Sequence, residues 1–231
     1  MIEPIPFAGL IEIRDEMTTF TTEDRISAQI EQGTAEWHQL RLGKVTASRV
    51  ADILAKTKTG VSASRGNYLI ELALQRVTNS IEESYTNEAM QWGKDNETQA
   101  RMAYEVQFGN FVDQVPFVDH PTIAWFGCSP DGLVDSEGLV EIKCPNSKTH
   151  WETFKSKTVP GKYVIQMQTQ MACTMRKWCD FVSFDPRFPE RSQLFVTRVQ
   201  RDEAFIQEVL QPEVIQFLKE VEVEVQLMKG K

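Results

Sequence analysis

The stretch from Cys128 to Cys144 constrains the fold more than any other part of the chain, because it has the pattern of a β-hairpin. In its second arm, Glu141 and Lys143 are two positions apart, so a strand would place both side chains on one face. Residues 135–138, Asp-Ser-Glu-Gly, favour a tight turn that brings this arm back beside Asp131. The pattern therefore predicts that the three charged side chains meet at one place on a sheet.

Each half of this pattern also has an ordinary structural interpretation. Ser-Pro-Asp-Gly at 129–132 is a common turn sequence, and Glu-Ile-Lys at 141–143 is compatible with an ion pair on a solvated sheet face. In this order and spacing, however, the two halves match a Pro-Asp, Asp/Glu-x-Lys signature and resemble the restriction-endonuclease-like nuclease superfamily. Two carboxylates so placed can hold a divalent cation through oxygen, with a lysine beside them.

The composition is that of an ordinary globular protein. The chain has 231 residues, of which 41% are hydrophobic and 25% charged, which suits one α/β domain without disulfides. No apolar run approaches the ~20 residues of a membrane span, and the N-terminus lacks a signal-peptide pattern. Four scattered cysteines fit reduced thiols. We expect a single domain over residues 1–231 in the cytoplasm, with a segment 1–32 of uncertain structure.

The formal net charge of −8 argues against DNA binding by overall attraction, since neutralising phosphates requires clustered lysine and arginine. Basic residues do gather locally, at Arg41 to Lys44, at Lys56, Lys58 and Arg65, and at Lys148, Lys155, Lys157 and Lys162. We therefore expect a basic groove on an acidic body.

Hydrophobic spacing and turn residues predict an α/β fold with a central mixed sheet flanked by helices. Helices are expected at 34–42, 50–55, 67–78, 87–109, 151–155, 163–175 and from 202 onward, the last interrupted by Pro212. Strands are expected at 111–118, 123–127, 139–144, 181–184 and 194–199. A polar, basic loop is expected at 56–66, and no repeat or linker divides the chain.

Two segments outside the hairpin carry candidate site residues. Thr46 or Ser48 would lie at the N-terminus of the helix at 50–55, where free N–H groups suit a phosphate, and Arg41 would close such a seat. A capping serine and a surface arginine are the ordinary alternative. In the helix at 87–109, Gly93 suggests close approach by another group, and Glu97, a turn later, either points at that group or faces solvent.

Five sequence blocks follow one another in a fixed order. They are Trp37-His38-x-Leu40-Arg41-Leu42-Gly43 with Thr46-Ala47-Ser48, Trp92-Gly93-Lys94-x-x-Glu97, Cys128-Ser129-Pro130-Asp131-Gly132, Glu141-Ile142-Lys143-Cys144-Pro145 and Gln166-x-Gln168. Together they resemble the lambda exonuclease family, the YqaJ-like viral recombinases. The resemblance extends from about Gly33 to the C-terminus.

This resemblance implies a restriction-endonuclease-like core and a 5′-to-3′ exonuclease that degrades one strand of linear duplex DNA. The product would carry a 3′ single-stranded overhang for recombination by strand annealing. The resemblance further implies Mg²⁺, two ions per active site with Mn²⁺ as a possible substitute, and a ring-shaped homotrimer. A single-strand annealing protein would be the partner, in a bacterial cell that carries the encoding phage or prophage.

The resemblance also implies roles for single residues. The metal ligands would be Asp131, Glu141, the Ile142 carbonyl and Glu97, which would face the second ion or the attacking water. Lys143 would orient that water and stabilise charge on the phosphate, with support from Gln166. Three residues would hold the 5′-phosphate, namely Arg41, Ser48 and Ser129.

Two other interpretations remain open at this level. Four cysteines are compatible with an iron–sulfur nuclease on the same scaffold, although only Cys173 and Cys179 are close in sequence. The chain is also compatible with a non-catalytic module that binds DNA ends. Intact Asp131, Glu141 and Lys143 speak against such a module, because binding alone does not require them to cluster.

Overall fold

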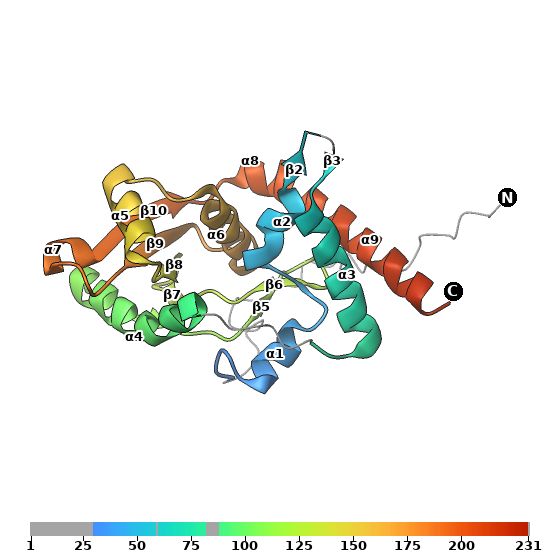
Figure 1. Ribbon diagram of the computed structural model, residues 1–231, viewed down its shortest axis with the longest axis horizontal. Helices are drawn as coiled ribbons and strands as arrows, with labels where there is room; N and C mark the ends of the chain where they lie inside the picture. Colours follow the sequence, from blue (N-terminus) through green and yellow to red (C-terminus); the bar gives the residue numbers. More distant parts are fainter. Residues whose placement is uncertain (1–29, 59, 82–87, 231) are drawn as a thin grey trace.

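The computed structural model describes residues 30–58, 60–81 and 88–230, and a five-stranded mixed sheet lies at its centre (Figure 1). The strand order is β10-β9-β8-β7-β4. The bounds are Val112–Asp113 for β4, Gly132–Val134 for β7, Gly138–Lys143 for β8, Trp178–Phe184 for β9 and Leu194–Gln200 for β10. Strands β8 and β9 are parallel, and the other neighbours are antiparallel. The predicted α/β fold with a mixed sheet is confirmed.

The hairpin of β7 and β8 matches the predicted one. Gly132 pairs with Val140 and Val134 pairs with Gly138, so residues 135–137 form the turn. Continued by one residue, this register places Asp131 opposite Glu141. The two acidic residues therefore lie side by side because of local pairing between neighbouring strands.

One arginine holds the turn of this hairpin from inside the molecule. Arg176 is buried, and its Nη1 donates hydrogen bonds to the carbonyl oxygens of Val134, Asp135 and Gly138 at 3.3, 2.6 and 2.9 Å. Asp135 itself has a left-handed backbone, with φ of 48°. The turn thus has a fixed shape that depends on a residue outside the hairpin.

A second sheet of three strands, in the order β1-β6-β5, was not predicted. It consists of β1 (Val45–Thr46), β6 (Phe126–Cys128) and β5 (Val118–Asp119). The single strand expected at 111–118 is wrong, because β4 joins the large sheet, β5 joins the small one, and Pro116 between them has no N–H for a ladder. The strand expected at 123–127 begins only at Phe126, since Trp125 has φ of 62°.

Nine α-helices surround the sheets in the described residues. They are α1 (Ala35–Arg41), α2 (Val50–Leu54), α3 (Ala63–Thr78), α4 (Glu88–Phe108), α5 (Ser147–Ser156), α6 (Gly161–Thr174), α7 (Glu190–Gln193), α8 (Glu203–Phe205) and α9 (Gln211–Met228). A 3₁₀ turn, Ala47–Arg49, precedes α2, and a π-helical segment, Ile206–Leu210, leads into α9. The helix expected from 202 onward is helical over residues 203–228, and its α-helical pattern is interrupted by the π-helical segment directly before α9, which has Pro212 in its first turn.

The loop expected at 56–66 is largely ordered. Two short strands, β2 (Lys56–Thr57) and β3 (Gly60–Val61), pair as an antiparallel ribbon. Helix α3 starts at Ala63, four residues earlier than predicted, because the Ser62 side chain accepts a hydrogen bond from the Arg65 N–H and caps the helix.

Alternating side chains on the large sheet pack on two different helices. Val140 and Ile142 lie in one core cluster with Ala100 and Tyr104 of α4. Leu139, on the opposite face, lies in the other cluster with Met167 and Met171 of α6, among others. Figure 1 shows the hairpin between these helices. Glu141 shares the Leu139 face and is therefore directed towards α6.

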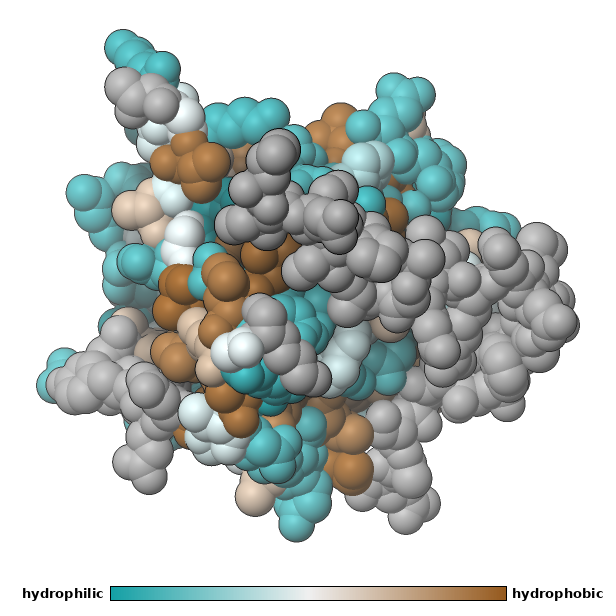
Figure 2. Space-filling model, turned by 90° about the vertical axis from the view of Figure 1, so that its right-hand side faces the viewer, coloured by the Kyte–Doolittle hydropathy of each residue, from teal (hydrophilic) through white to brown (hydrophobic). Residues whose placement is uncertain are grey.

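Helices α3 and α9 pack together and leave apolar side chains exposed at one end of the molecule. These are Ile70, Leu74, Val223, Leu227 and Met228. Figure 2 looks at this end and shows apolar side chains among polar ones. Within the described ranges, no helix is long and apolar enough to cross a membrane.

Candidate active site

The hairpin brings Asp131 against the following strand. Its Oδ2 accepts a hydrogen bond of 2.6 Å from the Ile142 N–H, the residue between Glu141 and Lys143. Glu141 is fully buried and forms an ion pair with the Lys143 Nζ. The structure therefore places together the three side chains that the sequence pattern singled out.

Helix α6 supplies two amide donors to Glu141. Gln166 Nε2 donates to Oε1 at 2.7 Å, and Gln170 Nε2 donates to Oε2 at 2.5 Å. These glutamines are one helical turn apart and so share a face. Gln166 was among the predicted site residues, but Gln170 was not. The sequence did contain a signal for Gln170: it is four residues after Gln166, so a helix places both side chains on the same face.

Burial and repulsion between neighbouring carboxylates shift the pKa values of the site residues. Burial and the neighbouring Glu141 and Glu97 raise the pKa of Asp131 well above its ordinary value, against the opposing effects of Lys143 and the Ile142 N–H. Burial opposes the charge on Lys143, but Glu141 and Asp131 outweigh it and raise the pKa of its ammonium group. Negative charge is thus concentrated beside one lysine, a surrounding that a divalent cation would stabilise.

Glu97 of α4 belongs to the same group. Burial raises its pKa, with a further rise from Glu141, while Lys143 and Arg101 lower it. Of the two interpretations of Glu97, the one that directs it to the site agrees with the structure. For Gly93, no atom outside the helix backbone lies within 4 Å of the place a Cβ would occupy, so no group among the described residues explains this glycine.

The two carboxylates Asp131 and Glu141 fit a divalent cation that takes its remaining oxygen ligands from water and from the substrate. In the part of the chain that the structure describes, no three histidine, cysteine, aspartate or glutamate side chains form a cluster that would hold a metal ion alone. Magnesium commonly binds through one or two carboxylates together with water and substrate phosphate oxygens. Asp131 and Glu141 supply such a pair, and both are fixed by the protein.

Arg41 and Ser129, two of the three predicted phosphate ligands, lie together. Arg41 Nη1 donates to Ser129 Oγ at 3.1 Å, and its guanidinium lies over the Trp37 ring at 4.1 Å. Trp37 Nε1 also donates to Ser129 Oγ, at 3.1 Å. Burial lowers the pKa of Arg41, and no carboxylate of the described residues pairs with it. A half-buried arginine without an acidic partner is suited to an anionic ligand.

Ser48, the third predicted phosphate ligand, makes no hydrogen bond to this pair in the described residues. It is exposed in the 3₁₀ turn before α2, and the structure gives no contact between it and Arg41 or Ser129. The predicted helix-end seat is therefore weaker than expected, since α2 has only five residues and the Thr46 N–H is taken by the Tyr68 hydroxyl at 3.1 Å.

Several basic residues of the expected groove are already paired with acids. Lys44 Nζ lies 2.7 Å from Asp119 Oδ1, and Arg65 Nη1 lies 2.6 Å from Glu220 Oε2. Lys56 Nζ lies 3.4 Å from a Glu213 oxygen. These side chains are less available to DNA than their spacing in the sequence suggested.

The four cysteines do not gather around one centre. All are buried thiols, and Cys144 lies in the α4 core cluster whereas Cys128, Cys173 and Cys179 lie in the α6 cluster. Burial raises the pKa of Cys144 to about 12, with further contributions from Glu97 and Asp131. Ligation of an iron–sulfur cluster requires converging thiolates, so this distribution speaks against that interpretation.

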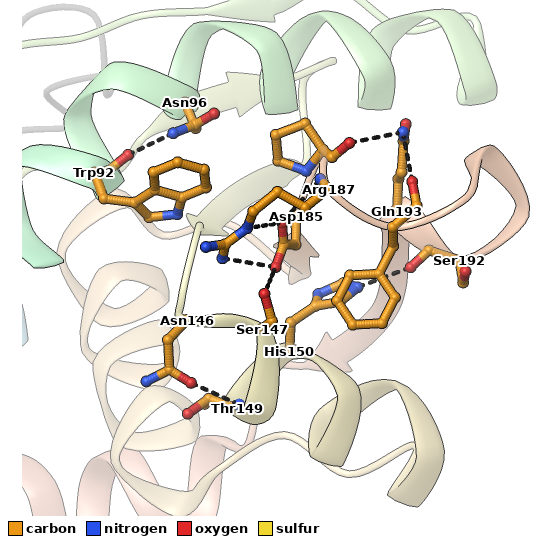
Figure 3. A network of polar contacts seen from close by, with 12 residues as sticks. Trp92, Asn96, Asn146, Ser147, Thr149, His150, Asp185, Arg187, Ser192 and Gln193 are labelled. Carbon is orange, nitrogen blue, oxygen red and sulfur yellow. Dashed lines mark hydrogen bonds and ion pairs between the residues drawn. The ribbon is translucent and has the colours of Figure 1, made fainter.

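A polar network that the sequence did not predict adjoins the site (Figure 3). Asp185, fully buried at the end of β9, accepts hydrogen bonds from Arg187 Nε and Nη2, both at 2.8 Å, and from Ser147 Oγ at 2.7 Å. Burial opposes the charge of Asp185, but these donors outweigh it and lower its pKa. The Arg187 guanidinium in turn lies over the Trp92 ring of α4, 4.1 Å from its centroid.

Known proteins resemble this chain in sequence and in fold. The family model of the YqaJ-like viral recombinase domain matches residues 36–177, which contain the residues of the candidate site. The crystal structure of an alkaline exonuclease from Laribacter hongkongensis, LHK-Exo, is 53% identical, with a TM-score of 0.79 over 85% of this chain and 97% of that one. The structure of LHK-Exo in complex with dAMP has the same identity and coverage and a TM-score of 0.80.

A more distant structure shares the fold alone. A phage-related exonuclease from Haemophilus somnus 129PT is 17% identical, with a TM-score of 0.59 over 81% of this chain and 96% of that one. No curated protein matches the chain in sequence. On the extent of the family match and the identity to LHK-Exo, the chain belongs to the YqaJ-like viral recombinases, the lambda exonuclease family that its motifs predicted.

Proposed function

We propose that this protein is a metal-dependent exonuclease that degrades the 5′-ended strand of linear double-stranded DNA and leaves a 3′ overhang. Family membership and the similarity to an alkaline exonuclease support the nuclease activity. The observation that carries the catalytic assignment is the meeting of Asp131, Glu141 and Lys143 on neighbouring strands.

Asp131, Glu141 and the Ile142 carbonyl would hold the first Mg²⁺, with Glu97 towards a second, and Mn²⁺ would be able to replace them. When bound, these ions supply positive charge that polarises the scissile phosphodiester and favours deprotonation of the attacking water. Gln166 and Gln170 keep the Glu141 carboxylate in one orientation, as the Ile142 N–H does for Asp131.

Lys143 and Glu97 act on the reacting groups. The Lys143 ammonium, beside the carboxylates, is placed to stabilise negative charge that develops on the phosphate oxygens. Glu97 would orient the attacking water and receive its proton, in agreement with the raised pKa that burial gives this carboxyl.

The proposed polarity depends on recognition of a 5′-phosphate. Arg41 and Ser129 form a half-buried, positively charged pair that suits a terminal phosphate, and Ser48 would be the third ligand of that phosphate. The complex of the similar LHK-Exo with dAMP supports a site for a deoxynucleoside monophosphate.

In the cell, we propose that the protein acts in the cytoplasm of a bacterial host that carries the encoding phage or prophage. It would act as a homotrimer and hand the exposed 3′ strand to a single-strand annealing protein. These proposals rest on family resemblance.

Digestion of linear duplex DNA labelled separately at its 5′ and 3′ ends tests the function. We expect Mg²⁺-dependent release of the 5′ label, faster from a 5′-phosphate than from a 5′-hydroxyl, and none with EDTA. Release of the 3′ label first would refute the polarity, and equal rates on the two kinds of 5′ end would refute the phosphate pocket. Binding of ends without release of nucleotides would favour the non-catalytic module.

A further inference from the structure

The first half of α4 carries Glu97 but has no fully buried side chain of its own among the described residues. The buried residues of this helix, Ala100 and Tyr104, both follow Glu97. Tyr104 fixes the second half, because its hydroxyl donates to the buried Asp180 of β9 at 2.8 Å. The position of Glu97 therefore depends on whatever holds the helix before it.

Trp92 connects this first half to the rest of the molecule. Its ring packs partly against the α4 core cluster and stacks on the Arg187 guanidinium, which lies 4.1 Å from the ring centroid. The Trp92 Nε1 is buried and has no hydrogen-bond acceptor in the part of the chain that the structure describes. The stack, and not a hydrogen bond from the indole, thus holds the ring in place.

Arg187 is itself held in one orientation. Its Nε and Nη2 bind both oxygens of Asp185 at 2.8 Å, and its backbone N–H donates to Oδ1 at 3.0 Å. A guanidinium bound as a fork to a buried carboxylate has little freedom to turn. Asp185 also accepts from Ser147 of α5, so the arginine is connected to the segment that follows Lys143.

Hydrogen bonds also hold the loop that carries Arg187. Gln193 Nε2 donates to the carbonyls of Pro186 and Phe188 at 3.1 and 2.8 Å, across the loop. His150 joins the loop to the sheet through Ser183 Oγ and the Ser192 carbonyl, at 2.9 and 2.8 Å. Figure 3 shows the contacts of Gln193 and the contact between His150 and Ser192 on one side of Asp185, and Trp92 on the other.

We propose that Arg187, held by Asp185 and stacked on Trp92, is a positioning residue that sets the place of Glu97 relative to Asp131 and Glu141. It acts through helix α4 and does not touch the reacting atoms. This inference rests on the proposed function for its kinetic consequence, but the anchoring of α4 by Arg187 is measurable without activity.

The test compares Arg187→Ala and Arg187→Lys with Trp92→Ala and Trp92→Phe in the full chain. We expect Arg187→Ala to lower kcat on linear duplex DNA by about 10- to 100-fold with little change in KM, because small displacements of a catalytic group have effects of this size. Arg187→Lys should be equally slow, since an ammonium group offers neither the fork nor the planar stack. Trp92→Phe should retain kcat and Trp92→Ala should lose it.

Arg198→Ala is the matched control. Arg198 also binds a buried aspartate, Asp180, and lies over a tryptophan, Trp178, at 3.4 Å, but that ring belongs to β9 and not to α4. The bond from Tyr104 to Asp180 remains in this variant. We expect a kcat close to that of the wild type.

Amide hydrogen exchange supplies the readout that does not need activity. In Arg187→Ala, residues 88–97 should exchange faster while residues 100–108 keep their protection. Unchanged exchange at 88–97, an unchanged kcat, or an equal loss of kcat in Arg198→Ala would overturn the proposal. Wild-type kinetics for Arg187→Lys would also overturn it, because charge alone would then suffice. If the wild type releases no nucleotides, the proposed function fails and the exchange result alone decides whether Arg187 anchors α4.

Discussion

At the scale of single residues, the buried carboxylate of Glu141 is the most demanding group of the site. A charge removed from water requires partners, and Glu141 has Lys143 and two amide donors from α6. If either glutamine is lost, a buried oxygen of Glu141 loses a hydrogen bond that offsets the cost of removing its charge from water. The glutamines therefore contribute to folding as well as to the orientation of the carboxylate.

Gln170→Met tests this role, since methionine has a similar volume and no donor. We expect the free energy of unfolding, measured with urea in the presence of EDTA, to fall by about 1–3 kcal/mol. Gln207→Met is the control, because Gln207 donates to Glu203 on an exposed helix surface and its loss should change stability by less than about 0.5 kcal/mol. Equal stability of Gln170→Met and the wild type would contradict the assignment.

Lys143→Ala tests the chemistry. We expect nucleotide release from linear duplex DNA to be abolished, while the affinity for a labelled duplex, measured by fluorescence anisotropy, stays largely intact. Lys177→Ala should release nucleotides normally, because Lys177 pairs with Glu137 at an exposed position. Normal turnover by Lys143→Ala would remove Lys143 from the mechanism.

Residues related by local spacing could be predicted from the sequence, and those related by tertiary contact could not. Asp131, Glu141 and Lys143 follow from strand alternation and a short turn, which act over a few residues. Arg187 and Trp92 are 95 positions apart by their numbers, and no local pattern joins them. Ser48 is exposed in a 3₁₀ turn and makes no hydrogen bond to Arg41 or Ser129, so its role as a phosphate ligand stays a prediction.

At the scale of elements, Gly93 in the first half of α4 has no structural explanation among the described residues. Alanine should stabilise the helix by about 0.5–1 kcal/mol at both Gly93 and Gly66, since Gly66 of α3 is similarly open. We expect Gly93→Ala, but not Gly66→Ala, to release nucleotides more slowly, because the added methyl would stand where DNA approaches. Equal rates in the two variants would show that nothing approaches Gly93.

The ion pair of Arg65 and Glu220 joins α3 to α9 and predicts a pH dependence. The hydrogen bond from Arg65 lowers the pKa of Glu220, against burial. Because the folded-state pKa is lowered, the pair stabilises the protein above the unfolded pKa and loses this effect as pH falls through the folded value. The difference in unfolding free energy between the wild type and Glu220→Gln should be present at pH 7 and shrink as the pH falls below the ordinary glutamate pKa of about 4.3. A constant difference in urea denaturation across this range would contradict it.

Element types were easier to predict than element bounds. The long periodic helices α4 and α6 and the strands β9 and β10 occur close to where hydrophobic spacing placed them. The bounds failed at 111–118 and at 56–66, where a proline and a capping serine decide the outcome. Sheet membership also escaped prediction, because two-residue strands such as β4 and β5 carry too little periodicity.

At the scale of the whole molecule, the net charge of −8 gives DNA no overall attraction to the protein. Lys44, Lys56 and Arg65 are paired with acidic residues, so DNA must bind at local sites elsewhere. A ring of three copies would concentrate such sites around one duplex and add contacts that a single copy lacks. We expect sedimentation velocity to give a species of three copies over a range of concentrations. A single copy at all concentrations would refute the ring and leave the exonuclease proposal to the digestion experiment.

The tip of a hairpin is usually the place where a protein best accepts added residues. Here Arg176 donates hydrogen bonds to three carbonyl groups of that tip. It therefore fixes both strands of the hairpin to the body of the protein. Extra residues inserted at 135–137 would pull the arms out of register and move the acids at their far end. If a peptide tag inserted at this position left turnover unchanged, the hydrogen bonds from Arg176 to the tip would not be needed to place the acidic residues.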